Sequence, residues 1–589
     1  MMSLVRNRGS LLLLLCVALA APSLLLAKPK LQNQRHLRQP VDLRLSKDNQ
    51  WLYVANRRSG SLSVIDVKKR QVVLEQQIGK QLSAIAINKR GNLLVAADEA
   101  AHQLIFMTPQ PGGAKVIQRL AISPYPVRLA FDQSDRRLFV TSLWSRRVSI
   151  VDLAGGPGAA KVAKVMDLPF APRCILPVRN DSHLIVADSF TGRLAVIDAK
   201  KYQLQAIREF PAHNIRGLNV SKNGKMLLIA HQMLNELAHT VRNDVHWGLL
   251  MSNDLRWLQL DLILNGSKDL YKGGRMHPLG EAGSATGDPA GLAVAPNGLV
   301  VVTLGGVGEV AVGKEEDYGL RRRQVGKRPT GVTVSSNSQT AFVADTFRDT
   351  VVEVALIESI PTKKIQLGPA AKLTLAQQGE RLFFNAKLSH DGWMSCHSCH
   401  TDGHTNSMLN DNLSDGSFGA PKRVLSLLGR AKTAPFAWNG GAANLEMQIR
   451  KSIRNTMQSD QDPNPKHVKA LAAFVRTLPA PPSLDKVRGL ENTKRIGRGK
   501  SLFLANRCNH CHIPPTYTSP KNYNVGLSDK LGNKLFNPPT LRGVGQRGPY
   551  FHDIRAKSLK DVLMKFKHQL KKPLSKEEFL DLRAFLRSL

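Results

Sequence analysis

Two pentapeptides near the C-terminal end of the chain combine residue types that together can hold a redox cofactor. They are CHSCH at residues 396–400 and CNHCH at residues 508–512, and both read C-x-x-C-H. Two thiols at this spacing can form thioether bonds to both vinyl groups of one porphyrin, and the histidine that follows then lies under the iron as its proximal ligand. The sequence therefore predicts two covalently bound c-type haems, held by Cys396, Cys399 and His400 and by Cys508, Cys511 and His512.

A zinc site built from the two cysteine pairs is the alternative interpretation of the same residues. It leaves unexplained why a histidine stands at the same position after each pair. The chain has six cysteines, and the two motifs use four of them. With an N-terminal export signal removed, Cys174 is the one cysteine left over, and we expect it to be a small, buried hydrophobic residue.

The N-terminus and the charge balance bear on location and partners. Residues 1–27 have a basic start, an apolar stretch and small residues near their end, as an export signal does. We therefore expect an exported, periplasmic protein, with an uncleaved membrane anchor as the alternative. No other long apolar run occurs, so the mature chain is expected to be soluble or peripheral to a membrane. Lys and Arg number 83 against 45 Asp and Glu, a net charge of +38, which favours an acidic redox partner protein or another polyanion. Export argues against nucleic acid as that partner.

A repeat of short strands occupies the first three fifths of the chain. Apolar cores such as YVA at 53–55, LVA at 94–96 and FVT at 139–141 alternate with period two and are bounded by Gly, Asn and Asp. Seven such copies recur, most of them at the spacing of roughly 40–45 residues that is typical of propeller blades. The sequence therefore predicts an all-β seven-bladed β-propeller over residues 28–365, closed into a ring so that few sheet edges are exposed.

The spacing between the fifth and sixth copies is longer, so residues 231–290 are expected to carry an insertion. Its first half is partly amphipathic and is predicted to be helical. An insertion between blades projects from a propeller face, where it could pack on the haem region or contact a partner. We do not expect its histidines to be metal ligands. They and a neighbouring tryptophan are His231, His239, His246, Trp247 and His277.

The strand pattern stops before residue 372, and the rest of the chain uses one arrangement twice. A short predicted helix, a haem motif and a closing amphipathic segment occupy residues 366–481, and the same order recurs over residues 482–589. The proline-rich run at 478–482 separates the two. We therefore predict a multidomain chain in which two tandem, mostly α cytochrome-c-like haem domains follow the propeller.

Longer stretches resemble two known families. YVANRRSGSLSVID and LIVADSFTGRLAVID resemble the YVTN-type β-propeller family, over roughly residues 40–360. The region 370–589 resembles the bacterial di-haem cytochrome c peroxidase/MauG-like family. The stretches that carry this second resemblance are LFFNAKLSHDGWMSCHSCH, FAWNGGAANLEMQ and PTLRGVGQRGPYFHD.

The second resemblance implies roles for individual residues. The haem on His400 would react with peroxide or a related oxidant, and the haem on His512 would relay electrons to it. Trp438 stands where the family has a tryptophan between the haems, and Gln448 where it has a distal-pocket glutamine. Gln458 stands where the family has a catalytic glutamate, and an amide cannot shuttle protons as a carboxylate does.

One further position departs from the family pattern, and one residue could compensate for Gln458. Glu446 could replace the missing glutamate only if its helix presented it to the pocket. The family has Met or Tyr as a haem ligand at the position of Phe566, and a phenyl ring cannot bind iron. Met564 and His568 flank that position four residues apart, so either is a candidate sixth ligand, with Tyr550 as a weaker one. Methionine would raise the reduction potential and a second histidine would lower it.

The resemblance also allows a calcium ion between the haem domains. Pro549 of the family pattern is present there, but Arg547 stands where the family has a threonine. Of the other histidines near the motifs, His397 and His510 are expected on the solvent side, and His404 behind the first ligand histidine.

Two functions are compatible with these residues. One is a di-haem oxidoreductase of the peroxidase type, and the spacing of Trp438 and Gln448 favours it. The other is a non-catalytic electron-transfer or redox-sensing cytochrome whose propeller docks a partner, and Gln458 and Phe566 favour that. No metal-ligand or acid–base set repeats across the blades, so the propeller itself is not expected to be an enzyme.

Overall fold

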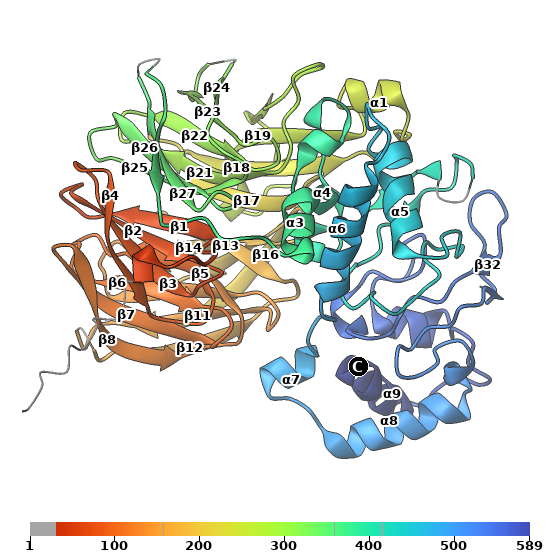
Figure 1. Ribbon diagram of the computed structural model, residues 1–589. Helices are drawn as coiled ribbons and strands as arrows, with labels where there is room; N and C mark the ends of the chain where they lie inside the picture. The colour runs from red at the N-terminus through yellow and green to blue at the C-terminus, as the bar shows by residue number, and fades with distance from the viewer. Residues whose placement is uncertain (1–30, 157, 318, 358–359, 414–415) are drawn as a thin grey trace, which may run out of the picture.

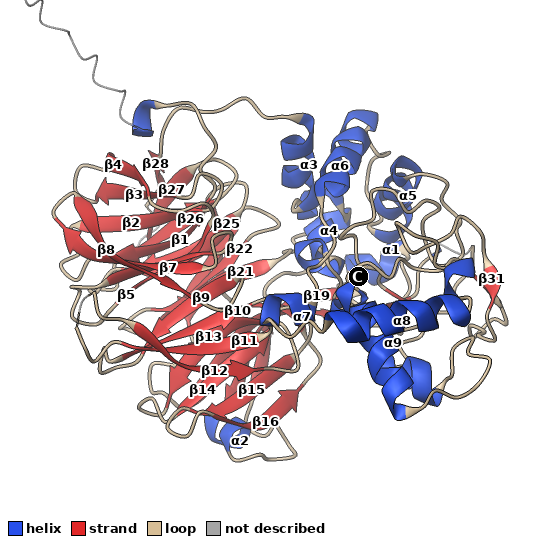
Figure 2. Cartoon of the chain, turned by 90° about the horizontal axis from the view of Figure 1, so that it is seen from below, coloured by secondary structure: helices blue, strands red, loops and turns tan. Residues whose placement is uncertain are grey.

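The structure is a computed structural model that describes residues 31–156, 158–317, 319–357, 360–413 and 416–589. The predicted export signal at residues 1–27 lies outside these residues. Figures 1 and 2 show two regions side by side, an all-β region built from the first part of the chain and a largely helical region built from the last part.

The described residues up to 366 form seven four-stranded antiparallel sheets, each with its strands in chain order. The first four sheets consist of β1 (Pro40–Leu45), β2 (Trp51–Asn56), β3 (Ser61–Asp66) and β4 (Gln71–Gln77); β5 (Leu82–Ile87), β6 (Leu94–Asp98), β7 (Gln103–Gln110) and β8 (Gly113–Ala121); β9 (Pro126–Phe131), β10 (Arg137–Ser142), β11 (Arg147–Asp152) and β12 (Lys161–Asp167); and β13 (Pro172–Val178), β14 (His183–Asp188), β15 (Arg193–Asp198) and β16 (Gln203–Glu209). The other three consist of β17 (His213–Val220), β18 (Met226–Leu234), β19 (Met251–Gln259) and β20 (Arg275–Pro278); β21 (Pro289–Val294), β22 (Leu299–Leu304), β23 (Glu309–Lys314) and β24 (Arg321–Gln324); and β25 (Pro329–Val334), β26 (Thr340–Asp345), β27 (Thr350–Ala355) and β28 (Lys363–Gln366).

These sheets are the blades of a closed ring. The first strand of each blade packs against the first strand of the next, and β25 in the last blade packs against β1 in the first. Polar contacts reinforce this closure. The Asp349 carboxylate accepts the backbone N–H groups of Arg38 at 3.1 Å and Gln39 at 2.8 Å, and Arg70 pairs with Glu353 at 2.6 Å. The predicted seven-bladed β-propeller is therefore confirmed.

The strands near the ring axis are apolar because each blade is covered on both faces. Residues 52–55 of β2 are at most 1% exposed although their side chains alternate between two faces. A strand buried on both faces reads as a short continuous apolar run, which is what the YVA-like repeats are. The outermost strands are more open, and Leu204 and Ile207 in β16 are 39% and 37% exposed.

Residues 231–290 are not a mainly helical insertion, because they contain β19 and β20, the last two strands of the fifth blade. β19 pairs with β18 along nine residues, and β20 pairs with β19. Helix is confined here to α1 (Arg242–His246) and α2 (Leu260–Leu264). The helix prediction is wrong because β19 buries two polar residues, Asn253 and Asp254, whose presence hides the strand pattern. The loop at 235–250 does project, and it packs on the helical region, as expected.

Two pairs of crossing helices organise the C-terminal region, and both pairs are seen in Figure 1. They are α3 (Leu375–Phe383) on α6 (Pro465–Thr477) and α8 (Thr493–Ala505) on α9 (Lys576–Ser588). The shorter elements of this region are η2 (Ala386–Leu388), η3 (His390–Gly392), α4 (Cys396–Cys399), η4 (Thr401–Gly403), β29 (Leu409–Asn410), β30 (Lys422–Arg423), α5 (Leu445–Lys451), α7 (Leu484–Arg488), η7 (Cys508–His510), β31 (Tyr523–Asn524), β32 (Leu535–Phe536), η8 (Val544–Gln546) and two π-helical turns, η6 (Ser452–Thr456) and η9 (Asp561–Lys565). One short 3-10 helix, η1 (Leu31–Asn33), precedes the first blade.

A glycine permits each helix crossing. A Cβ atom on Gly379 of α3 would lie 1.9 Å from the Ala470 carbonyl oxygen of α6, and one on Gly499 of α8 would lie 2.0 Å from the Asp581 carbonyl oxygen of α9. Only a residue without a side chain allows the two backbones to approach this closely. The same device in both pairs agrees with two haem domains built on one plan. No helix among the described residues is both long enough and apolar enough to cross a membrane.

Candidate haem sites

The first C-x-x-C-H motif lines a cavity in the first haem domain. α4 carries Cys396 and Cys399 on one helical turn, and the His400 N–H closes that turn on the Cys396 carbonyl at 2.9 Å. Both thiols and the imidazole line the cavity, together with Trp438 and Gln448. The three groups that the sequence assigns to the first haem are therefore brought to one wall of one cavity.

Burial sets the protonation states of these groups. It lowers the pKa of His400 to about 4, so the imidazole is neutral at pH 7 and keeps a lone pair for a metal. Burial also raises the pKa values of Cys396 and Cys399 to about 12. A neutral buried thiol suits a carbon–sulfur bond better than a thiolate metal site.

The charged part of this cavity wall is cationic. Lys422, Arg423, Arg430 and Lys451 line it, whereas no Asp or Glu does so among the described residues. A haem carries two propionate groups, which cationic side chains can neutralise with charge-assisted hydrogen bonds. The cavity therefore fits a haem, but it offers no carboxylate for proton transfer to a bound oxidant.

Trp438 connects the two haem domains. Its indole lines the first cavity, and its Nε1–H donates to the Arg423 carbonyl at 2.8 Å. Its own carbonyl accepts the Asn537 N–H of the second domain at 2.7 Å. Its ring meets His552 edge-on at 6.2 Å between centroids, and the residue is 8% exposed. An oxidisable aromatic ring thus lies at the junction of the two domains.

Gln448 and Glu446 come from the same helix, α5, but only Gln448 lines the cavity. The Gln448 amide donates to the Ser452 hydroxyl at 3.3 Å. Glu446 instead forms an ion pair with Arg476 at 2.8 Å. The helix does not present Glu446 to the cavity, so this glutamate does not replace the carboxylate that the family has elsewhere.

Gln458 is not among the residues that line the first cavity, although its neighbours Asn455, Thr456 and Met457 are. Its Nε2 donates to the Thr240 carbonyl of the fifth blade at 2.6 Å and to the Asn455 carbonyl at 2.7 Å. The amide therefore joins the first haem domain to the propeller loop. A carboxylate could not make these two donations, which gives a physical reason for glutamine at this position.

The second motif orients its histidine through the backbone. His512 Nδ1 lies 3.1 Å from the Tyr517 carbonyl, so this nitrogen carries the proton and Nε2 is left to bind a metal. Burial lowers the pKa of His512 to about 4, and the charge on nearby His568 acts in the same direction. Burial raises the pKa of Cys508 to about 11. These residues fit a haem ligand set in the same way as the first motif.

The two candidate sixth ligands of the second haem both lie in this domain. Met564, in the π-helical turn η9, packs in the same apolar cluster as Cys508. His568 packs against Phe551 with ring centroids 5.4 Å apart. The Tyr550 hydroxyl donates to the Val544 carbonyl at 2.9 Å.

The two cysteine pairs do not form a shared zinc site. Among the described residues, the one group of three or more His, Cys, Asp or Glu ligand atoms within 4.8 Å of one another is His246, His390 and Asp391. The structure therefore does not bring the two cysteine pairs together as the zinc alternative requires. His246 belongs to the propeller loop whose histidines were not expected to bind a metal. Cys174 is 4% exposed in the propeller core, as predicted.

Each motif has a second histidine between its cysteines, His397 in the first and His510 in the second, and the exposure of one of them differs from the prediction. His397 is 2% exposed, because the propeller covers the motif on this side. Its Nδ1 accepts the Asp402 N–H at 3.0 Å, and its ring packs on Phe384 with centroids 4.7 Å apart. The prediction of a solvent-side His397 is wrong, whereas His510 is exposed as predicted.

His404 joins three parts of the chain. Its Nδ1 lies 2.9 Å from the Ser426 hydroxyl, and its Nε2 lies 3.1 Å from the Gln546 carbonyl of the second haem domain. Its ring also packs against Trp144 and Phe190 of the propeller. It supports the first motif from behind, as expected, and does so by contact with every domain.

The propeller holds the first haem motif directly, which the sequence did not predict. The Asp288 carboxylate, at the entry to the sixth blade, accepts the Ser395 hydroxyl at 2.5 Å and the Ser398 hydroxyl at 2.8 Å. His213 Nε2 donates to the Ser398 carbonyl at 3.0 Å. Burial raises the pKa of Asp288, while the two hydroxyls and Arg328 oppose that rise. Asp288 looks like an ordinary turn residue in the sequence, so no local signal marks this role.

Arg547 places a positively charged side chain at the position where the family resemblance allows a calcium site. Its Nη2 donates to the Leu428 carbonyl at 2.5 Å, and its own carbonyl accepts Arg423 Nη1 at 2.7 Å. Burial lowers the pKa of Arg547 to about 9, which leaves the side chain cationic at pH 7. Two guanidinium groups beside Pro549 disfavour a calcium ion there.

Comparison with known proteins divides the chain in the same way. Residues 374–479 match a family model described as di-haem cytochrome c peroxidase. Residues 24–131 match a family model described as lactonase, 7-bladed β-propeller.

Several curated proteins are similar to the C-terminal part of the chain. The methylamine utilization protein MauG of Methylorubrum extorquens is 29% identical over 298 residues, which cover 39% of this chain and 82% of that protein. A cytochrome c551 peroxidase of Nitrosomonas europaea is 29% identical over 280 residues, covering 39% and 84%. Among solved structures, Kuenenia stuttgartiensis hydrazine synthase matches 56% of this chain and 99% of that chain, with 16% identity and a TM-score of 0.48. That last likeness is too distant to bear on function.

Proposed function

Because the C-terminal region is similar to di-haem cytochrome c peroxidases and MauG proteins and follows a seven-bladed β-propeller, we propose that this protein is an exported di-haem oxidoreductase. Its electrons would pass from the haem held by Cys508, Cys511 and His512 to the haem held by Cys396, Cys399 and His400. The oxidant would be a peroxide or a related small molecule. When bound, the haems supply electron transfer and the reduction of that oxidant at iron.

The chain's own residues divide the remaining work. His400 and His512 are the proximal ligands, both neutral because they are buried. The cationic wall of the first cavity neutralises the propionates. Gln448 orients an oxidant or a water by hydrogen bonding, since an amide can donate and accept but cannot take up a proton. Trp438 offers an oxidisable ring between the two domains.

One observation carries the proposal. Trp438 and Gln448 line the same cavity as the first C-x-x-C-H motif, although they come from different segments of the chain. A cytochrome that only relays electrons needs no polar amide beside its haem, whereas an amide there can orient a bound oxidant by hydrogen bonding. The combination is what an oxidant-binding haem requires.

A second candidate function has its own support. No Asp or Glu lines the first cavity among the described residues, so the general acid–base group of a fast peroxidase is missing. This favours a non-catalytic electron-transfer or redox-sensing cytochrome, in which the propeller docks a partner. The two functions differ in whether peroxide is turned over.

Stopped-flow mixing of the half-reduced holoprotein with hydrogen peroxide separates the two functions. The oxidoreductase is expected to lose its reducing equivalents to peroxide in a saturable reaction, and more slowly than a peroxidase with a cavity carboxylate. If spectroscopy instead shows that both haems are six-coordinate, and peroxide does not oxidise them, the protein is an electron-transfer or redox-sensing cytochrome.

A matched pair of variants tests the missing carboxylate. Asn455→Asp adds a carboxylate to the cavity wall and is expected to raise the peroxide rate by about 10-fold or more, toward the range of general acid–base catalysis. Gln458→Glu adds the same group three residues away, outside the cavity lining, and is expected not to raise it. If Gln458→Glu alone accelerates the reaction, the side chain at 458 reaches the oxidant and this assignment of the cavity is wrong.

A further inference from the structure

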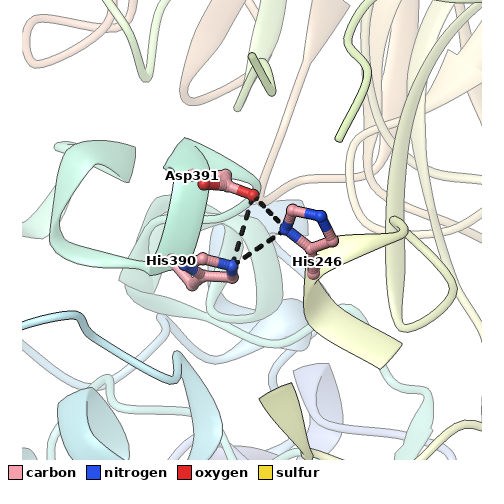
Figure 3. Close-up of side chains that lie close together, drawn as sticks. All are labelled: His246, His390 and Asp391. Atoms are coloured by element: carbon pink, nitrogen blue, oxygen red, sulfur yellow. Dashed lines mark hydrogen bonds and ion pairs between the residues drawn. The ribbon is translucent and has the colours of Figure 1, made fainter. Parts of the chain in front are cut away.

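Three potential metal ligands converge where the propeller meets the first haem domain. Figure 3 shows His246, His390 and Asp391 with their donor atoms turned toward one another. His246 Nδ1 lies 3.1 Å from His390 Nε2 and 2.8 Å from an Asp391 carboxylate oxygen, and His390 Nε2 lies 3.3 Å from that same oxygen. The three atoms form a nearly equilateral triangle.

The backbone holds this cluster in position from both sides. His246 ends α1 in the propeller loop, and its carbonyl accepts the Trp393 indole N–H at 3.1 Å. Gly248, with φ +68°, follows so closely that a Cβ atom would lie 2.6 Å from the Trp393 ring. His390 and Asp391 belong to η3, and His390 is 7% exposed. The cluster is thus preorganised by packing that does not involve its own side chains.

A neighbouring carboxylate fixes which nitrogen of His390 is free. His390 Nδ1 lies 2.8 Å from Asp460 Oδ1, and because a carboxylate only accepts hydrogen bonds, this nitrogen must carry the proton. In the neutral imidazole the lone pair of His390 is then on Nε2, which lies 3.3 Å from the Asp391 carboxylate oxygen. At 3.3 Å this nitrogen and this oxygen need a proton or a metal ion between them, and a metal ion could also bind His246 Nδ1.

We propose that His246, His390 and Asp391 bind one divalent transition-metal ion, for which Zn²⁺ is the probe. Metal–nitrogen and metal–oxygen bonds of about 2.0–2.2 Å separate neighbouring donors by about 2.9–3.4 Å, depending on geometry. The three separations of 2.8, 3.1 and 3.3 Å lie close to that range. Asp460 would act as the supporting carboxylate that many metal-bound histidines have.

The ligand set also selects the class of metal. Two imidazoles and one carboxylate suit zinc, copper, iron or nickel, whereas calcium and magnesium prefer all-oxygen sites. Three protein ligands leave a fourth position open, and the His246 side chain is 36% exposed, so water can reach it. Because His246 belongs to the propeller and the other two ligands to the first haem domain, the ion would join the two domains.

The test uses the holoprotein after dialysis against a chelator, titrated with zinc chloride by calorimetry. The wild-type protein is expected to bind one equivalent of Zn²⁺ tightly and to unfold at a higher temperature when zinc is present. His246→Gln and Asp391→Asn are each expected to abolish this equivalent. Asp460→Ala, which removes a positioning residue, is expected to weaken it by about 10–100-fold.

Controls separate this site from adventitious binding. His467→Gln removes an exposed histidine from α6 and is expected to leave zinc binding unchanged. The Soret band and the circular dichroism of each variant report whether it is folded, which His246→Gln should be because the residue is partly exposed. X-ray absorption at the zinc edge should show nitrogen and oxygen ligands without sulfur.

Two results would overturn the site. One is a wild-type protein that binds no tight equivalent of zinc, which would leave the cluster as a hydrogen-bonded contact with a shared proton. The other is zinc binding that survives both His246→Gln and Asp391→Asn, or that shows sulfur at the zinc edge, because the ion would then be held elsewhere.

Discussion

Trp438 occupies a position where a single ring can affect electron flow without affecting haem attachment. It lines the first cavity, while its carbonyl and its ring contact the second domain. Trp438→Phe removes the indole N–H bond to the Arg423 carbonyl and replaces the ring by one that is harder to oxidise. We expect slower electron transfer between the haems at unchanged haem content, measured by stopped-flow spectroscopy. Trp51→Phe, in the first blade, is the matched control and should leave the rate unchanged. An equal loss of electron-transfer rate in both variants would show that Trp438 has no special role.

Asp288 shows how one propeller residue supports the first haem motif. It has φ +52°, and it accepts two serine hydroxyls of the motif. Asp288→Ala leaves both hydroxyls without their acceptor, at about 1–3 kcal/mol for a buried unpaired group, and adds strain because alanine disfavours positive φ. We expect a lower unfolding temperature together with a shifted Soret band. Asp288→Asn should be milder, because asparagine tolerates this φ and still accepts one hydrogen bond.

Asp181 provides the control for Asp288. It is also buried and has φ +60°, but it accepts the Gln133 backbone N–H within the propeller. Asp181→Ala should therefore lower stability without a change in the haem spectrum. If both alanine variants shift the Soret band equally, the effect comes from the propeller as a whole and not from contact with the motif.

At the scale of elements, the helix crossings give a test within a single helix. Gly499 and Gly497 both lie in α8, but a Cβ atom at 499 would lie 2.0 Å from the Asp581 carbonyl, whereas none of the described atoms lies within 4 Å of one at 497. Gly499→Ala is expected to destabilise the second haem domain by about 1–3 kcal/mol through overpacking. Gly497→Ala should stabilise it by up to about 1 kcal/mol through helix propensity. Thermal unfolding of the two variants would contradict this if both moved in the same direction.

The two π-helical turns, Ser452–Thr456 and Asp561–Lys565, correspond between the haem domains. In each, the residue three positions beyond the turn donates its N–H to the second residue of the turn, Ser459 at 3.2 Å and His568 at 3.1 Å. The residues that line the first cavity are known, so this correspondence can be used to choose between the candidate sixth ligands of the second haem.

That correspondence favours Met564 as the sixth ligand of the second haem. Met564 matches Asn455, which lines the first cavity, and His568 matches Ser459, which is not among the lining residues described. Because an axial methionine raises the potential, Met564→Ala is expected to lower the potential of the second haem in a redox titration. His568→Ala should leave it nearly unchanged. A raised potential in His568→Ala, with no change in Met564→Ala, would instead mean that both axial ligands are histidines.

How much the sequence predicted depends on how local each signal is. The C-x-x-C-H motifs and the blade repeat are carried by neighbouring residues, so the propeller could be predicted and the candidate haem ligands could be named. β19 could not, because Asn253 and Asp254 are polar yet buried, and burial in a ring is decided by the neighbouring blades. The contacts of Asp288 with the motif, and of His246 with η3, join segments more than 100 residues apart, which no local pattern records.

At the scale of the whole molecule, the propeller and the first haem domain share their interior surfaces. One apolar cluster contains Leu234 and Val245 of the propeller together with Trp393, Ile453 and Leu471 of the haem domain. The propeller therefore does more than present loops to a partner, because it forms part of the support of the haem motif.

The net charge of +38 gives the last prediction, which concerns the electron donor. A strongly basic surface steers an acidic donor protein toward the haems, and salt screens that attraction over a Debye length of about 10 Å at 0.1 M. The rate constant for reduction by an acidic cytochrome or cupredoxin should therefore fall steeply as sodium chloride increases in stopped-flow experiments. A basic donor of similar potential serves as the control, and its rate should rise with salt because repulsion is screened. If the rate with the acidic donor does not change with salt, the positive charge of the protein lies away from the surface on which the donor docks. The polyanion that this charge attracts is then not the electron donor.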